Sequence, residues 1–254
     1  MVRTDPLTVN TSGLVQALFC SKAVELLYSV KYLVFYRIDM LKRNHSLIDR
    51  LIIEFDQILA TACPREQVKA HRPSPADEIP ENDLSRAERS HSGGLMRVNH
   101  AGEVSAQALY QGQALTSRSK QVRQTMWQSA KEEIDHLAWC AKRLDELGGH
   151  TSYLNPLWYL GSLTIGTLAG ICGDKWSLGF VVETERQVVI HLQGHLEELP
   201  KQDLKSRAIV NQMVEDEARH GVTAMEVGGA ELPAPIKKMM KISSRVMTRT
   251  AYWL

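Results

Sequence analysis

The chain has 254 residues, of which 44% are hydrophobic and 23% charged, and its 30 Lys and Arg residues nearly balance its 29 Asp and Glu residues. This balance argues against a general nucleic-acid-binding protein, which usually carries a clear basic excess, so no nucleic-acid partner is expected. The four cysteines lie far apart and form no C-x-x-C pair, which argues against a disulfide framework and against a zinc site. Aromatic residues make up only 6% of the chain, and the composition favours helix over sheet.

The first 63 residues divide into two predicted segments. Residues 1–46 form an N-terminal extension of unassigned role, in which charged residues interrupt an apolar stretch and favour an amphipathic helix over a signal peptide. Residues 47–63 carry apolar residues at helical spacing, which predicts a short amphipathic helix. Residues 1–39 are expected to be dispensable, with Met40 as an alternative translation start.

The next segment, residues 64–90, carries four prolines among polar residues and is predicted to be a linker. Residues 91–254 are almost wholly helical in pattern and are predicted to form the main domain. Its helices are expected to break at residues 117–119, 148–149, 173, 200 and 228–235, where glycines, prolines and serines stand.

Three E-x-x-H pairs stand in the sequence. They are Glu88 with His91, Glu133 with His136, and Glu217 with His220. Positions i and i+3 share one face of a helix, so the carboxylate and the imidazole of a pair can bind one metal ion. The first pair lies at the edge of the linker without a partner glutamate, and we interpret it as an ordinary surface feature.

The positions of two further glutamates, Glu103 and Glu183, support a metal site. Glu103 precedes Glu133 by 30 residues, with the predicted turn at residues 117–119 midway between them. In two antiparallel helices that rise 1.5 Å per residue, both side chains return to the same height, about 21 Å from the turn. Glu183 and Glu217 are likewise separated by 34 residues around a predicted break. The sequence therefore predicts a duplicated helical hairpin, each copy with one Glu and one E-x-x-H pair.

This pattern matches the ligand set of ferritin-like bundles that hold two metal ions. The candidate ligands are Glu103, Glu133, His136, Glu183, Glu217 and His220. Oxygen and nitrogen ligands without thiolates favour iron or manganese over structural zinc. The alternative is that such glutamates are ordinary solvated helix residues, and we interpret Glu132, Glu185 and Glu215 in this way. Glu103 and Glu183 stand among apolar neighbours instead, where an unpartnered carboxylate is costly.

Several motifs carry a resemblance to a known family. They are LMRVNHAGE at residues 95–103, EIDH at 133–136, VETE at 182–185 and EARH at 217–220, together with Tyr110 and NPLW at 155–158. From about residue 47 to its end the chain resembles the demethoxyubiquinone hydroxylase family of ubiquinone biosynthesis. The resemblance implies an all-α fold, a ferritin-like four-helix di-iron bundle with extra N-terminal and C-terminal amphipathic helices. It also implies an O2-dependent monooxygenase that hydroxylates the ring of a polyprenylated demethoxyubiquinol.

Carried over residue by residue, the resemblance also implies a ligand assignment. One iron ion would be held by Glu103, Glu133 and His136, and the other by Glu183, Glu217 and His220, with Glu133 and Glu217 bridging the two. The outer ring nitrogens of the two histidines are expected to donate hydrogen bonds to nearby carboxylates. Asp135 and Asp216 stand close in sequence, but neither is assigned to a histidine.

Two stretches suggest contact with a membrane, where a polyprenyl quinol resides. Residues 151–173 carry no charge but have recurrent glycines, which predicts a closely packed bundle helix with a lipid-facing side rather than a spanning helix. Residues 234–254 carry five basic residues and no acidic one among apolar residues, which is typical of binding to an anionic membrane surface. The alternative for the second stretch is a solvated last helix of the bundle.

The expected partners are therefore a lipid-soluble quinol, O2 and a membrane surface, and association with other enzymes of ubiquinone biosynthesis stays open. The expected location is the cytoplasmic face of the bacterial inner membrane, with the mitochondrial inner membrane as the weaker alternative. Two other functions compete. A ferritin- or rubrerythrin-like protein that handles iron or peroxide would need the ligands but not the uncharged and basic stretches. A membrane-binding bundle without enzyme activity would need those stretches but not the ligands.

Overall fold

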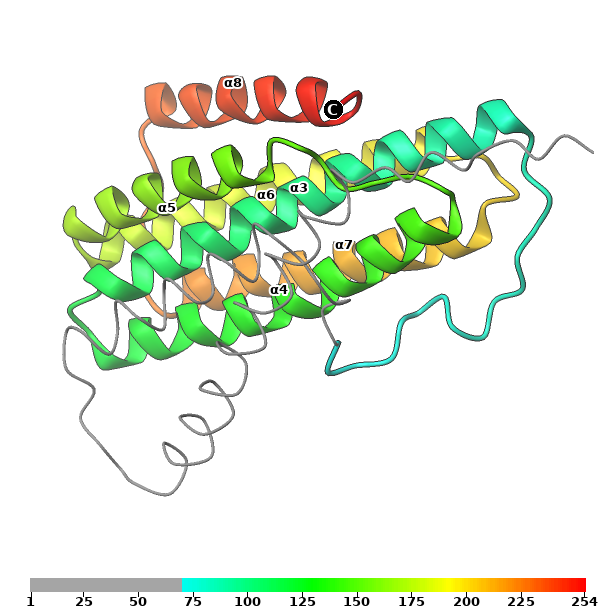
Figure 1. Ribbon diagram of the computed structural model, residues 1–254. Coiled ribbons are helices and arrows are strands. Elements are labelled where there is room, and N and C mark those ends of the chain that lie inside the picture. The colour runs from blue at the N-terminus through cyan, green and yellow to red at the C-terminus, as the bar shows by residue number, and fades with distance from the viewer. Residues whose placement is uncertain (1–69) are drawn as a thin grey trace, which may run out of the picture. The chain divides into compact units, whose positions relative to one another are not determined.

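The computed structural model describes residues 70–254 of the chain. The predicted extension 1–46, the predicted helix 47–63 and the beginning of the predicted linker lie outside the described residues. Within 70–254 the chain forms six helices and no strand, which confirms the all-α prediction (Figure 1). The helices are α3 (Arg86–Thr116), α4 (Lys120–Glu146), α5 (Asn155–Ile171), α6 (Asp174–Glu198), α7 (Leu204–Glu226) and α8 (Ala234–Ala251).

The bundle consists of two helical hairpins and two additional helices. Helices α3 and α4 form the first hairpin, α6 and α7 form the second, and α5 packs along α3. Helix α8 contacts α3 and α6, and Figure 1 shows it on the side of the bundle away from α4 and α7. The turns between the paired helices fall at the predicted breaks near residues 117–119 and 200.

Helix α3 begins earlier than predicted. We expected the linker to extend to residue 90, but the helix starts at Arg86 because Ser85 and Glu88 form a capping box. The Ser85 hydroxyl accepts a hydrogen bond from the Glu88 backbone N–H, and the Glu88 carboxylate accepts one from the Ser85 N–H. Such a cap stabilises a helix by about 1 kcal/mol. Glu88 therefore caps a helix and does not belong to either group of candidate metal ligands.

Helices α3 and α5 pack so closely at two glycines that a larger residue would not fit there. A Cβ atom on Gly166 would lie 2.2 Å from the Leu109 carbonyl oxygen, and one on Gly112 would lie 2.4 Å from the Leu163 carbonyl oxygen. The glycines of the uncharged stretch thus serve the close packing that the sequence predicts. None of the described helices is both long and apolar enough to cross a bilayer.

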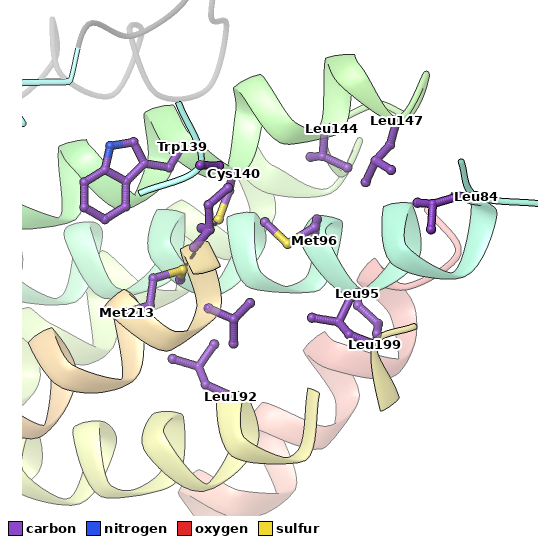
Figure 2. Close-up of a cluster of buried hydrophobic side chains, with 13 residues drawn as sticks. Leu84, Leu95, Met96, Trp139, Cys140, Leu144, Leu147, Leu192, Leu199 and Met213 are labelled. Carbon is purple, nitrogen blue, oxygen red and sulfur yellow. Dashed lines mark hydrogen bonds between the residues drawn. The ribbon is translucent and has the colours of Figure 1, made fainter. Parts of the chain in front are cut away.

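Two apolar clusters fill the bundle at different levels. The first apolar cluster includes the residues labelled in Figure 2, namely Leu84, Leu95, Met96, Trp139, Cys140, Leu144, Leu147, Leu192, Leu199 and Met213. The second includes Tyr110, Ala114, Val122, Met126, Ala130, Leu178, Val181 and Ala224. On each hairpin helix, the level between the two clusters is occupied by buried carboxylates and histidines. The polar site is therefore closed above and below by apolar packing.

Residues 70–84, which we call the strap, contact the bundle although the sequence predicts a linker. Leu84 and Ala76 belong to the first apolar cluster. Glu81 accepts hydrogen bonds from Arg143 of α4, whose side chain is 1% exposed. The prolines exclude a regular helix, as predicted, but the strap, which forms a turn at residues 75–78, still packs on the bundle through its other side chains.

Candidate metal centre

Four helices bring carboxylates and imidazoles together at the level between the two apolar clusters. Two groups of ligand atoms form there, with all atoms of a group within 4.8 Å of one another. The first group is Glu103, Glu133, His136 and Glu217, and the second is Glu185, Glu217 and His220. All six side chains are buried. The arrangement can hold metal ions, as the spacing of the E-x-x-H pairs predicts.

Glu133 and Glu217 each face both histidines. One oxygen of Glu133 lies 3.1 Å from Nδ1 of His136, and its other oxygen lies 3.4 Å from Nδ1 of His220. The two oxygens of Glu217 lie 3.1 Å from the same two nitrogens, one each. A carboxylate that presents one oxygen to each of two neighbouring positions has the geometry of a bridging ligand.

The outer ring nitrogens of the histidines are held by carboxylates of the opposite hairpin. Nε2 of His136 on α4 donates to Asp216 of α7 over 3.0 Å, and Nε2 of His220 on α7 donates to Glu132 of α4 over 2.8 Å. These bonds turn Nδ1 of each ring toward the cluster. Histidines that bind metals are usually oriented in this way, by a hydrogen bond from the other ring nitrogen to a carboxylate. Glu132 is thus a functional candidate that we interpreted from the sequence as merely solvated. Asp216 has the role that the sequence left unassigned.

The position predicted for Glu183 is wrong. Its carboxylate accepts hydrogen bonds from Arg186 and Gln187, outside both groups of ligand atoms. Glu185 takes the place in the cluster, where the buried Tyr110 hydroxyl donates to it. Positions two apart differ by about 200° around a helix, so only one of the two glutamates can face the cluster.

A sequence signal for this choice exists. Leu178, Val181, Glu185, Val188 and Leu192 recur at spacings of three and four residues, which is the pattern of one helix face. Glu183 lies off that face. The apolar residues directly before it are neighbours in sequence but not on the same side of the helix. Spacing along one face is the better guide than the neighbours in sequence.

In the metal-free protein the buried carboxylates lie so close together that the charge of one raises the pKa of its neighbour. Burial and then the negative charge of Glu133 raise the pKa of Glu103 well above its usual range, and burial and then Glu217 do the same for Glu185. Burial alone would lower the pKa of His136, but hydrogen bonds to Asp216 and to the glutamates raise it. In the metal-free protein, bound protons therefore balance the negative charge of the cluster. Divalent cations can replace these protons, so metal binding must release them.

The donor set fits a pair of metal ions. Oε1 of Glu133 and Oε1 of Glu217 are buried and form no hydrogen bond of good geometry, although each faces a histidine Nδ1, at 3.4 Å and 3.1 Å. A buried carboxylate oxygen without a partner is costly in a protein, and a cation bound between the groups would satisfy both oxygens. Four carboxylates would also neutralise the four positive charges of two divalent ions.

A cavity of about 620 Å³ connects the cluster to the side of the bundle where α5 and α8 lie. Glu103, Glu185 and Glu217 line its inner end. Its other walls include Trp158 and Ile165 of α5 and, on α8, Met239, Met240 and Met247. The volume is in the range of small-molecule sites, and the lining is mostly apolar.

A polar corner of the cavity was not anticipated from the sequence. His191 and Asn99 line it, and Nε2 of His191 has no hydrogen-bond partner. The ring of His191 lies 4.0 Å from the ring of buried His195, whose Nδ1 donates to the Asn99 side-chain oxygen over 2.7 Å. Burial lowers the pKa of His195 to about 3. His191 and His195 lie four positions apart on one face of α6, whereas Asn99 of α3 joins them only when α3 packs near α6.

A helical bundle with buried Glu and Glu-x-x-His ligands on facing helices defines the class of ferritin-like carboxylate proteins that bind two metal ions. Within that class, the model of the family "Ubiquinone biosynthesis protein COQ7" matches residues 90–251. The chain belongs to this family, which confirms the resemblance seen in its motifs. Family membership sets aside the interpretations as an iron- or peroxide-handling protein and as a bundle without enzyme activity.

Curated bacterial relatives agree with this assignment. The chain is 58% identical over 207 residues to a 3-demethoxyubiquinol 3-hydroxylase of Nitrosomonas eutropha, which covers 82% of this chain and 99% of the relative. It is 58% identical over 212 residues to the enzyme of the same name from Nitrosococcus oceani, covering 84% and 99%. A third enzyme of that name, from Chromobacterium violaceum, is 56% identical over 207 residues, covering 81% and 99%.

Proposed function

We propose that this protein is a 3-demethoxyubiquinol 3-hydroxylase, an O2-dependent monooxygenase that acts on the ring of a polyprenylated quinol at a pair of iron ions. The residues that would hold the ions are Glu103, Glu133, His136, Glu185, Glu217 and His220, of which Glu133 and Glu217 each face both histidines and would be shared between the two ions. The names of the full-length relatives support the reaction. Ligation by oxygen and nitrogen without thiolates supports iron.

The observation that carries the proposal is the cavity. It ends at three of the ligands on one side and at the exposed apolar residues of α5 and α8 on the other. A quinol ring can enter it and reach the cluster while its prenyl tail stays among apolar side chains. Transfer of that tail into water would cost about 0.8 kcal/mol per CH2 group, so an entrance that keeps the tail in lipid is favoured.

Iron, when bound, supplies the redox chemistry that activates O2, and the side chains supply its surroundings. Asp216 and Glu132 keep the two imidazole rings oriented, and Tyr110 keeps Glu185 oriented. The apolar clusters above and below the centre exclude water from it. The open side faces the cavity, so the substrate ring approaches from there.

We further propose that the enzyme binds peripherally to the cytoplasmic face of the bacterial inner membrane. Helix α5 exposes Leu157, Leu160 and Leu168 at 53–58% of their surface. Helix α8 exposes Met239 at 65%, and Trp253 just beyond it is 78% exposed. Lys238, Lys241, Arg245 and Arg249 on α8 are exposed as well. Exposed apolar residues flanked by cations favour an anionic lipid surface.

The test is hydroxylation by the purified full-length chain. Protein loaded with iron under nitrogen is mixed with a reduced short-tailed demethoxyubiquinol and then exposed to ¹⁸O2. We expect one labelled oxygen atom in the product ring by mass spectrometry, and about two iron ions per chain by metal analysis. A chain that binds two iron ions but leaves the quinol unchanged would contradict the reaction. A chain that hydroxylates the quinol after complete iron removal would contradict the proposed centre.

A further inference from the structure

Arg72 of the strap connects two carboxylates that stand on different helices. Its Nε donates to Oδ2 of Asp135 on α4, and its Nη2 donates to Oδ2 of Asp216 on α7, each over 2.8 Å. The backbone N–H of His71 donates to the other oxygen of Asp135 over 2.5 Å. The strap thereby contacts both hairpins at the level of the metal centre.

The Asp216 oxygen that accepts from Arg72 also accepts from His136. The distance from Nε2 of His136 to Oδ2 of Asp216 is 3.0 Å. Asp216 is fully buried, and its second oxygen accepts from Arg219 over 2.8 Å. Arg72 and His136 therefore share one carboxylate oxygen, Oδ2 of Asp216. The hydrogen bond from Arg72 fixes the position of this oxygen, which in turn orients the His136 ring.

Trp139 fixes Arg72 in turn. The Arg72 guanidinium lies over the indole ring at 4.9 Å from its centre, and the indole N–H donates to the Arg72 carbonyl oxygen over 3.3 Å. The centre of the His136 ring lies 5.4 Å from that of Trp139. Guanidinium, indole and imidazole are thus neighbours, and a planar guanidinium with two donors is suited to hold two carboxylates at once.

We propose that Arg72 is a positioning residue of the metal centre, which orients His136 through Asp216. The inference rests on the proposed function, because it takes His136 as a metal ligand. Arg72 lies before the residues that the family model matches, which begin at residue 90. The two histidines are supported differently, since the carboxylate behind His220, Glu132, accepts from Arg219 but from no described residue of the strap.

The test compares two ways of loosening the strap in the full-length chain. Arg72→Ala removes the side-chain contacts with Asp135 and Asp216, whereas Lys142→Ala removes the ion pair of 2.6 Å between α4 and Asp77 of the strap. The second change weakens attachment of the same strap to the same helix without touching either carboxylate. The metal-free proteins are titrated with cobalt(II) against a chelator. Affinity, the visible absorption of bound cobalt, and the thermal unfolding midpoint without metal are recorded.

We expect Arg72→Ala to weaken the binding of one of two cobalt ions by about 10- to 100-fold, the usual effect of removing support from a metal ligand. Its cobalt absorption should change, because the geometry at His136 changes. Lys142→Ala should bind both ions within about twofold of the parent protein, as for an exposed ion pair. Arg72→Lys should recover part of the affinity, since an ammonium group can reach one carboxylate but not hold both.

Two outcomes separate this inference from the proposed function. If the parent protein binds no cobalt, the proposed metal centre is wrong. If the parent binds two ions and Arg72→Ala binds them equally tightly with the same absorption, the positioning role is wrong and the metal centre stands. Equal losses in Arg72→Ala and Lys142→Ala would also overturn the inference, because they would assign the effect to attachment of the strap.

Discussion

The carboxylates of Glu183 and Glu185 are two positions apart on α6, but only that of Glu185 reaches the cluster. Glu185→Gln keeps the shape of the side chain and removes its charge. We expect this variant to lose most of its affinity for the second metal ion, because Gln is a neutral and weaker ligand for a hard cation. Metal titration of the purified variant measures the loss.

The matched control is Glu183→Gln on the same helix. Its carboxylate pairs with Arg186 rather than with the cluster, so this variant should retain both metal ions with parent-like affinity. Loss of metal in Glu183→Gln with retention in Glu185→Gln would reverse the assignment.

His195 predicts a pH dependence of stability at one residue. Burial, reinforced by the nearby His191, lowers its pKa from 6.5 to about 3. The folded state therefore keeps the ring neutral, whereas the unfolded chain takes up a proton below pH 6.5. The stability contribution of the neutral ring is present above pH 6.5 and is lost progressively as the pH falls toward 3.

His195→Gln has no such loss. The unfolding free energy of the parent relative to that of His195→Gln should therefore fall by about 1.6 kcal/mol from pH 6.5 to pH 5. Urea denaturation of the metal-free proteins across this range measures it, and other titrating groups cancel in the difference. Parallel pH profiles for the two proteins would show that His195 is not buried in its neutral form.

The contact between helices α3 and α5 does not tolerate a larger side chain at its glycines. A methyl group on Gly166 would meet the Leu109 carbonyl oxygen at 2.2 Å, so the helices must move apart to admit it. We expect Gly166→Ala to lower the free energy of unfolding by about 2–3 kcal/mol, as overpacking does. Denaturant unfolding gives this value directly.

Gly161, on the same helix, serves as the control. A Cβ atom there would meet nothing within 4 Å, and alanine is the better helix former. Gly161→Ala should therefore raise the free energy of unfolding by up to about 1 kcal/mol. If both variants lose stability equally, close packing at Gly166 is not the cause.

The starts of α5 and α6 could be predicted from the sequence because local signals mark them, whereas the start of α3 was placed too late. Pro156 stands at the start of α5, and Gly173 adopts a positive φ of 107° directly before α6. The path of the strap could not be predicted in this way. Its prolines indicate only that the segment is not helical, whereas its position depends on pairs such as Arg72 with Asp216, which are separated by 144 residues.

At the scale of the whole molecule, the cavity and the basic residues of α8 relate the chemistry to a membrane. Reversing the charge at Lys238 and Lys241 should weaken binding to anionic vesicles by about 1 kcal/mol per residue. The variant should hydroxylate a long-tailed quinol in vesicles more slowly and a soluble short-tailed quinol at the parent rate. Vesicle sedimentation and the two rates test this expectation.

The control reverses the charge of two exposed lysines elsewhere, Lys131 of α4 and Lys201 before α7. Figure 1 shows α4 on the side of the bundle away from α8. This variant should bind vesicles like the parent protein. If both variants weaken vesicle binding equally, or if both quinol rates fall together, α8 is not the membrane-binding element.

The candidate site was predictable where it repeats and unpredictable where it does not. Glu103, Glu133 and Glu217 could be predicted because paired glutamates lie at equal distances from the turn of each hairpin. All three lie in the cluster. Glu185 was missed because the apolar residues before Glu183 gave a stronger local signal than the spacing along the helix. The polar corner at His191 also includes the hydrogen bond between His195 of α6 and Asn99 of α3, and a contact between helices leaves no periodic pattern in the sequence.

The exchange of supporting carboxylates between hairpins has a consequence for how the protein is made. His136 on the first hairpin depends on Asp216 of the second, and His220 on the second depends on Glu132 of the first. A ribosome releases the first hairpin well before the second. During that interval the nascent chain holds His136 without Asp216, and it lacks both Glu217 and His220. The full set of candidate ligand atoms can therefore assemble only after synthesis has passed α7.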